Sequence, residues 1–209
     1  DMNPQKIAFA QNSDQRSLDQ VINDADLFLG LSGPNVLTPE MVAKMAARPI
    51  IFALANPTPE IQPDAARAVA PDAIIATGRS DVPNQVNNVL CFPFIFRGAL
   101  DVGATQINDA MQIACVDAIA ELARASTSAE AAAAYQGEQM TFGPDYLIPK
   151  PFDPRLSGVI ASAVASAAME TGVATRVLDN IEAYKAELDA SVFKSALLMR
   201  PVFESARLA

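Results

Sequence analysis

Short apolar runs alternate with amphipathic segments over roughly the first 80 residues, and this pattern is typical of an open α/β sheet. The apolar runs cover residues 26–34, 49–55 and 73–77. The first ends in Gly33 and Pro34, the second is followed by Asn56, and the third ends at Thr77. We predict a strand in each run, and we expect the first strand to be buried on both faces. Because helical patterns separate the runs, the strands should be parallel, with right-handed crossovers.

Helical segments are marked by cap residues and by apolar positions at helical spacing. Before and between the strands they cover residues 17–24, 38–45 and 63–69. Beyond residue 84 the strand pattern stops, and the expected helical segments are 86–90, 92–100, 107–123, 128–135, 154–171, 180–188 and 192–207, with an irregular loop at 141–151. The predicted fold class is therefore α/β, a partial Rossmann-like parallel sheet with a helical C-terminal portion.

Composition excludes several function classes. The chain has 209 residues, is 51% hydrophobic and carries a net charge of −9 without a basic cluster, so we expect neither a nucleic-acid partner nor an anionic membrane surface. The apolar stretch 89–100 is too short for a membrane span and is interrupted by Pro93 and Arg97. Histidine is absent, which excludes histidine bases, Ser-His-Asp triads and histidine metal ligands within this chain.

Two cysteines, Cys91 and Cys115, lack the CxxC spacing of zinc or redox sites. Their apolar neighbours suggest that both are small buried hydrophobic residues, which fits a reducing cytoplasm. The chain starts at Asp1 without an initiator methionine or a plausible first strand, so we expect it to be part of a longer polypeptide.

Candidate binding residues follow the strands, because ligands of open α/β sheets sit beyond the carboxyl ends of the strands. Asn56 follows the second strand, and its amide either holds a ligand or closes a local Asx-turn. Asn87 and Asn88 begin a helical segment, where they either cap the helix or face an anion or a carboxamide. Ser32 and Gly33 follow the first strand. They either let the backbone approach a ligand closely or form a plain strand-to-loop turn.

Four linked motifs, taken in order, resemble the bacterial malic enzymes. They are residues 50–57 (IIFALANP), 76–81 (ATGRSD), 83–90 (PNQVNNVL) and 92–101 (FPFIFRGALD). The resemblance runs from about Leu18 to Thr175. The segment 197–203 looks like the linker of the large hybrid malic enzymes, in which a phosphotransacetylase-like domain follows.

The resemblance implies an activity and a set of partners. Enzymes of this family oxidise malate with NAD or NADP and decarboxylate the product to pyruvate and CO2, with a divalent metal, Mg or Mn. It implies that Asn56 and Asn88 contact malate and the nicotinamide side of the cofactor, with Asn87 adjacent and Ser32-Gly33 near the dinucleotide. A cytoplasmic homo-oligomer is expected.

The resemblance also implies that much of the active site lies outside this chain. The family's tyrosine acid, lysine base, acidic metal ligands and glycine-rich turn have no matching motif here, so no catalytic or metal-binding residue is assigned. We expect residues 1–175 to form the later part of the NAD(P)-binding domain and residues 176–209 a helical linker. The alternative is a non-catalytic module for dimerisation or docking within a multidomain enzyme.

Overall fold

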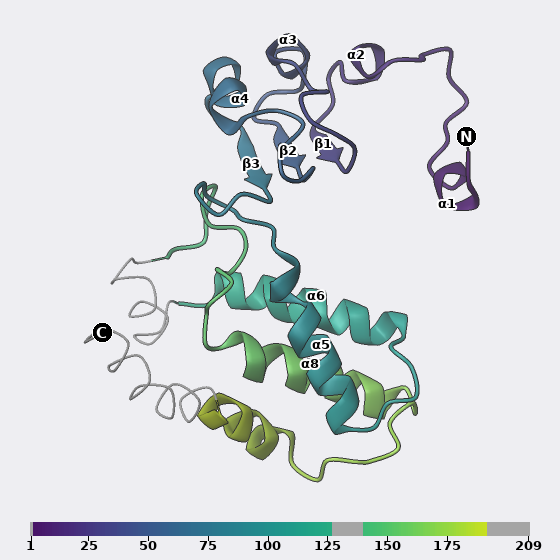
Figure 1. The fold of residues 1–209 in the computed structure, drawn as a ribbon, viewed down its shortest axis with the longest axis vertical. Helices are drawn as coiled ribbons and strands as arrows, with labels where there is room; N and C mark the ends of the chain where they lie inside the picture. Colours follow the sequence, from purple (N-terminus) through teal and green to yellow (C-terminus); the bar gives the residue numbers. More distant parts are fainter. Residues whose placement is uncertain (1, 127–139, 192–209) are drawn as a thin grey trace, which may run out of the picture. The chain divides into compact units, whose positions relative to one another are not determined.

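The computed structural model describes residues 2–126 and 140–191. The chain divides into two compact units, Asp1–Val82 and Pro83–Ala209, and each is described by itself. Figure 1 shows a small sheet with helices in the first unit and a bundle of longer helices in the second.

A three-stranded parallel sheet forms the centre of the first unit. Its strands are β1 (Leu27–Gly30), β2 (Ile50–Ala53) and β3 (Ile74–Thr77), in the spatial order β1-β2-β3. In the register, Phe28 lies beside Ile51, and Ile51 lies beside Ile75. These three buried side chains form part of the hydrophobic core of the first unit. The predicted parallel sheet and its three strands are confirmed.

Short helices precede and link these strands. They are α1 (Pro4–Ile7), α2 (Leu18–Val21), α3 (Pro39–Val42) and α4 (Pro63–Val69). The start of α3 follows from its sequence, because the Thr38 hydroxyl accepts a hydrogen bond from the Met41 N–H at 3.3 Å and proline occupies the first turn. Val42 of α3 and Ala66 of α4 are buried in the same core as the strands.

One expectation about β1 is wrong. The strand is buried on one face only, since Phe28 is 8% exposed while Leu27 and Leu29 are 50% and 56% exposed. Among the residues of the first unit that the structure describes, the core cluster gathers on the Phe28 side of the sheet. A continuous apolar run in the sequence does not show which face of the strand is packed against other residues of the chain.

The second unit is helical. It contains the 3₁₀ helix η1 (Asn88–Leu90) and the helices α5 (Phe92–Asp101), α6 (Asp109–Arg124) and α8 (Leu156–Glu170). These match the predicted segments, except that 86–90 forms only the short η1. The predicted segments 128–135 and 192–207 lie outside the described residues.

The core of the second unit lies between α5, α6 and α8. Its fully buried side chains include Met111 of α6 and Leu156, Ile160 and Val164 of α8. Gly98 of α5 allows close packing, since a Cβ there would lie 2.4 Å from the carbonyl oxygen of Ala161. The helices therefore touch through backbone as well as side chains.

The segment 181–191 continues as a helix and joins this core through Tyr184 and Leu188. The Tyr184 hydroxyl donates to Asp101 Oδ2 at 2.6 Å, and Arg97 Nε donates to the same oxygen. Burial and the bond to Asp101 raise the pKa of Tyr184, so its hydroxyl stays protonated. The domain boundary at residues 175 and 176 stays a prediction.

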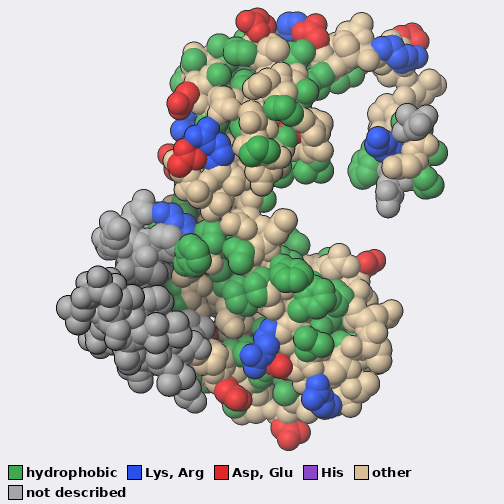
Figure 2. All heavy atoms as spheres, in the orientation of Figure 1, with side chains coloured by type: hydrophobic (Ala, Val, Ile, Leu, Met, Phe, Trp, Pro, Cys, Tyr) green, Lys and Arg blue, Asp and Glu red, His purple; other side chains and the backbone are tan. Residues whose placement is uncertain are grey.

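Apolar side chains also reach the surface of the second unit. Figure 2 shows hydrophobic side chains gathered over the region of α5. On this helix Phe92, Phe96 and Leu100 are 64%, 45% and 66% exposed, and the first two rings pack with centroids 5.2 Å apart. No helix within 2–126 or 140–191 combines the length and apolarity that a membrane crossing needs.

Candidate functional site

The carboxyl edge of the sheet carries an exposed amide. Asn56 lies three residues beyond the end of β2, before Pro57, and it is exposed. Its side chain makes no hydrogen bond to any other residue that the structure describes, so the local Asx-turn is not formed. The amide is available to an outside hydroxyl, carboxylate or carboxamide.

Behind this edge lies a buried carboxylate that sequence reasoning missed. Glu60 is 0% exposed, and its two oxygens accept hydrogen bonds from two different loops. Oε1 accepts from the Ser32 N–H at 2.9 Å and from the Ser32 hydroxyl at 3.3 Å. Oε2 accepts from the Ala55 N–H at 3.0 Å. One side chain thus joins the loop after β1 to the loop after β2.

The backbone around Glu60 reinforces this junction. The Leu37 N–H donates to the Glu60 carbonyl and the Asn35 N–H donates to the Pro59 carbonyl, both at 3.1 Å. Gly30, at the end of β1, has no side chain where the carboxylate lies, and a Cβ there would be 2.5 Å from Glu60 Cδ. The glycine therefore leaves room for the carboxylate.

Glu60 is ionised at neutral pH. Burial acts to raise the pKa of its carboxyl, but the hydrogen bonds from Ser32 and Ala55 outweigh burial and hold the pKa below the ordinary value of 4.5. Within the described parts of the chain no lysine or arginine forms an ion pair with it. The charge is balanced by backbone and hydroxyl dipoles alone.

The Ser32–Gly33 segment is therefore held by hydrogen bonds from Ser32 to the Glu60 side chain. Ser32 uses its N–H and hydroxyl internally, toward Glu60. Gly33 has open space around it, since a Cβ built there would meet nothing within 4 Å. A close approach of a ligand to this backbone is sterically allowed, and the assignment to a cofactor stays a prediction.

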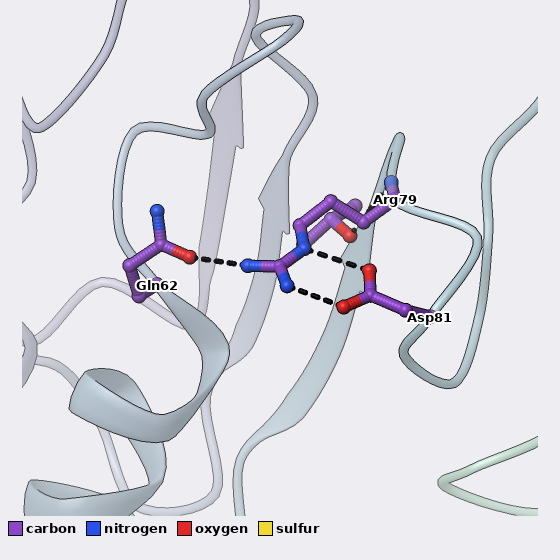
Figure 3. A network of polar contacts seen from close by, with 4 residues as sticks. Gln62, Arg79 and Asp81 are labelled. Carbon is purple, nitrogen blue, oxygen red and sulfur yellow. Dashed lines mark hydrogen bonds and ion pairs between the residues drawn. The ribbon is translucent and has the colours of Figure 1, made fainter.

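Arg79 and Asp81 pair with each other beyond β3. Figure 3 shows the Arg79 guanidinium between Gln62, at the start of α4, and the Asp81 carboxylate. The Nε–Oδ1 distance is 2.9 Å, and Nη1 donates to Gln62 Oε1 at 2.6 Å. The hydrogen bond from Arg79 lowers the pKa of Asp81. Arg79 and Asp81 thus form an ion pair with each other, and because both side chains are exposed the pair adds little to the stability of the fold.

The asparagines of the second unit differ from one another in their contacts. Asn87 caps η1, because its Oδ1 accepts from the Val89 N–H at 3.0 Å. Asn88 is exposed, and no side-chain hydrogen bond joins it to the rest of the described chain. Asn56 and Asn88 belong to different units, and their convergence on one ligand stays a prediction.

Asn84 is a structural residue that the sequence did not single out. Its side chain is buried, donates to the Pro144 carbonyl at 2.7 Å and accepts from the Leu147 N–H at 2.8 Å. Its φ of 57° lies in the left-handed region, which asparagine tolerates better than most residues. Asn84 thereby fixes the loop at 140–150 on the second unit.

The two thiols lie together, which their separation along the sequence had hidden. Cys115 is buried, Cys91 is half-buried, and their sulfurs are 3.4 Å apart without a disulfide. Burial and the contact with Cys91 raise the pKa of Cys115 to about 12, so this thiol is not a nucleophile at neutral pH.

The described residues do not fit a metal ion. No group of three or more histidine, cysteine, aspartate or glutamate side chains is placed to hold one within 2–126 and 140–191. Glu60, the buried carboxylate of the edge, already has both oxygens occupied by backbone donors. At this edge the Asn56 amide is exposed and the space around Gly33 is open, and their assignment to a nicotinamide cofactor stays a prediction.

Comparisons of the sequence with a protein family and with individual proteins agree on one family. The sequence pattern of the family "Malic enzyme, NAD binding domain" matches residues 2–135. The "NADP-dependent malic enzyme" of Salmonella typhimurium is 62% identical over 203 residues, which are 97% of this chain and 27% of that protein. The "NAD-dependent malic enzyme" of Rhizobium meliloti is 59% identical over 206 residues, with 99% and 27% covered.

A solved structure agrees with the fold. The crystal structure of malic enzyme from Pyrococcus horikoshii superposes with a TM-score of 0.74 at 36% identity, over 91% of this chain and 40% of that one. The chain spans about a quarter of the length of the curated relatives named above.

Proposed function

Because the chain belongs to the malic enzyme family through its NAD-binding domain, we propose that it works as part of an enzyme that oxidises malate and decarboxylates the product to pyruvate and CO2. The nicotinamide cofactor, NAD+ or NADP+, accepts the hydride. The single observation that carries the proposal is an exposed asparagine amide, Asn56, beyond the carboxyl end of a central parallel strand in a chain of this family.

The proposed role of Asn56 and Asn88 is orientation. An amide can donate to a substrate carboxylate or hydroxyl and accept from a carboxamide, but it cannot exchange protons at neutral pH. Holding malate and the nicotinamide ring in fixed relative positions brings the hydride donor and acceptor within reacting distance. Asn87, whose oxygen caps η1, supports the backbone from which Asn88 projects. Ser32 and Gly33 would lie along the dinucleotide.

We assign proton transfer and metal binding to other parts of a longer polypeptide. Within 2–126 and 140–191 no group of side chains is placed to hold a metal ion, so the metal would be bound by other residues of that polypeptide. The isolated 209-residue chain is expected to be inactive with malate for the same reason. We further propose a hybrid enzyme with a phosphotransacetylase-like domain after this chain, working as a homo-oligomer in the cytoplasm.

A kinetic experiment tests the proposal. The full-length polypeptide carrying this chain is assayed for malate-dependent reduction of NAD+ and NADP+ with Mg²⁺ or Mn²⁺, as wild type and as Asn56→Ala and Asn88→Ala. We expect activity in the wild type and a loss of roughly 10- to 100-fold in kcat/KM in each variant, from misorientation. Melting temperatures should change little, because neither side chain is bonded within the described chain.

Asn23 provides the matched control. It is exposed in the turn before β1, at the opposite end of the strands from Asn56, so Asn23→Ala should leave kcat/KM unchanged. A wild-type polypeptide without malate-dependent activity would refute the function. Full activity in both Asn56→Ala and Asn88→Ala would refute the roles of the two amides.

A second candidate function rests on the exposed apolar face of α5. Phe92, Phe96 and Leu100 would then form a contact with a second subunit or with another domain, and the chain would serve assembly rather than catalysis. In that case Asn88→Ala should alter the oligomeric state and leave turnover normal. Sedimentation analysis of the same variants separates the two functions.

A further inference from the structure

We propose that Glu60 is a positioning residue that fixes the loops after β1 and β2 against each other and so sets the place of the Asn56 amide. The inference deepens the proposed function and rests on it for its catalytic consequence. The geometric part stands on the contacts of Glu60 alone.

The contacts of Glu60 span the carboxyl edge of the sheet. Ser32 lies two residues after the end of β1, and Ala55 lies two residues after the end of β2 and directly before Asn56. The carboxylate accepts from both N–H groups, at 2.9 and 3.0 Å, with one oxygen for each loop. A shift of the carboxylate must therefore move at least one of the two loops or break a hydrogen bond.

The groups around the Glu60 side chain favour a carboxylate over an amide at this position. All three groups that face its oxygens are donors, namely two N–H groups and the Ser32 hydroxyl. An ionised carboxylate is an acceptor only, with room for all of them, whereas a glutamine must turn its NH2 group toward one N–H. Burying an ionised group without a cation is costly, so a buried carboxylate used only for packing would be a poor choice.

The Glu60 carboxylate affects the site because it binds the N–H of Ala55, the residue directly before Asn56. Asn56 has no hydrogen bond of its own within the described chain, so its placement depends on the backbone that carries it. That backbone is tied at Ala55 to Glu60. Loss of this tie should leave Asn56 present but misplaced, and a small misplacement of an orienting group is enough to slow a reaction strongly.

The test uses Glu60→Gln in the full-length polypeptide, with two measurements. Hydrogen exchange followed by mass spectrometry reports on the peptides that contain Ser32 and Ala55. Steady-state kinetics gives kcat and KM for malate and for the cofactor. We expect exchange at one of the two amides to accelerate by about tenfold, as for the loss of one hydrogen bond. We expect kcat/KM for malate to fall roughly 10- to 100-fold.

Two further variants make the result specific. Ile51→Val removes one methyl group from the buried core of the same sheet, so it should lower the melting temperature while kcat, KM and exchange at Ser32 and Ala55 stay at their wild-type values. Gly30→Ala keeps the carboxylate but places a methyl group 2.5 Å from its Cδ and 2.7 Å from Phe28 Cε1. It should reproduce the kinetic defect, and Ile51→Val controls for the disturbance of the core. If Glu60→Gln does not fold, Gly30→Ala carries the test.

The outcomes separate this inference from the proposed function. Wild-type kinetics or unchanged exchange at both amides in Glu60→Gln would overturn the positioning role. The same kinetic loss in Ile51→Val would also overturn it, because general destabilisation would then explain the effect. If the wild type does not oxidise malate, the proposed function fails by itself, and amide exchange alone decides the role of Glu60.

Discussion

Gly98 is the position where the packing of the second unit makes the sharpest prediction. It lies in the middle of α5, and replacing it with alanine would place a Cβ 2.4 Å from the Ala161 carbonyl oxygen of α8. The same Cβ would lie 3.0 and 3.1 Å from two atoms of Val164. The carbonyl belongs to the backbone of a helix, so it cannot turn away as a side chain can. The two helices must separate.

Two opposing terms set the magnitude. Alanine is favoured over glycine in a helix interior by about 1 kcal/mol. Overpacking of a close-packed core costs typically 1–3 kcal/mol and sometimes more. The contact with Ala161 involves backbone, so we take the cost at the upper end of that range. We expect Gly98→Ala to lower the free energy of unfolding by about 2 kcal/mol in total.

Urea unfolding followed by far-ultraviolet circular dichroism measures this change. Gly158→Ala is the comparison, because a Cβ there meets the Asp189 side chain, which can rotate, and it should cost less than Gly98→Ala. Gln112→Ala, on the exposed side of α6, should stay within about 0.5 kcal/mol of wild type. A Gly98→Ala protein as stable as wild type, or more stable, would refute the close α5–α8 packing.

Three further predictions concern buried polar groups. Asn84→Gly keeps the left-handed backbone but removes the hydrogen bonds to Pro144 and Leu147. Limited proteolysis should therefore cut the loop at 140–150 faster, and the free energy of unfolding should fall by about 1–3 kcal/mol. An unchanged cleavage rate would contradict this prediction. Tyr184→Phe removes the bond to Asp101 and should cost about 1 kcal/mol in urea unfolding, and no loss would show the bond to be unimportant. The folded-state pKa of Glu60 lies below its ordinary value of 4.5, so its contribution to stability is complete above about pH 4.5 and is lost as the pH falls through the lower folded-state pKa. Unfolding measured against pH should show this loss in wild type and not in Glu60→Gln, and equal curves would contradict it.

Local sequence signals were sufficient for most elements of the fold. The cap at Thr38 with the following proline marked the start of α3, and the three apolar runs marked the three strands. These signals work because caps, proline and periodicity act within a few residues of the element that they shape. The exposed face of β1 could not be predicted in this way, because burial depends on what packs against the strand.

The site was only partly predictable for the same reason. The place of Asn56, three residues beyond the end of β2, could be predicted because the end of a strand is visible in the sequence. Glu60 was missed, since its partner Ser32 is 28 positions away and only the parallel pairing of β1 with β2 brings them together. The contact between Cys91 and Cys115, 24 positions apart, was hidden by the same distance along the chain.

A crystal structure of the full-length polypeptide with oxidised cofactor and a non-reacting dicarboxylate in place of malate tests the central claim most directly. We predict that the Asn56 and Asn88 amides lie within hydrogen-bond distance, about 2.7–3.2 Å, of ligand or cofactor atoms. We also predict that Glu60 keeps its hydrogen bonds to Ser32 and Ala55. A complex in which both amides face solvent, away from both bound molecules, would contradict it.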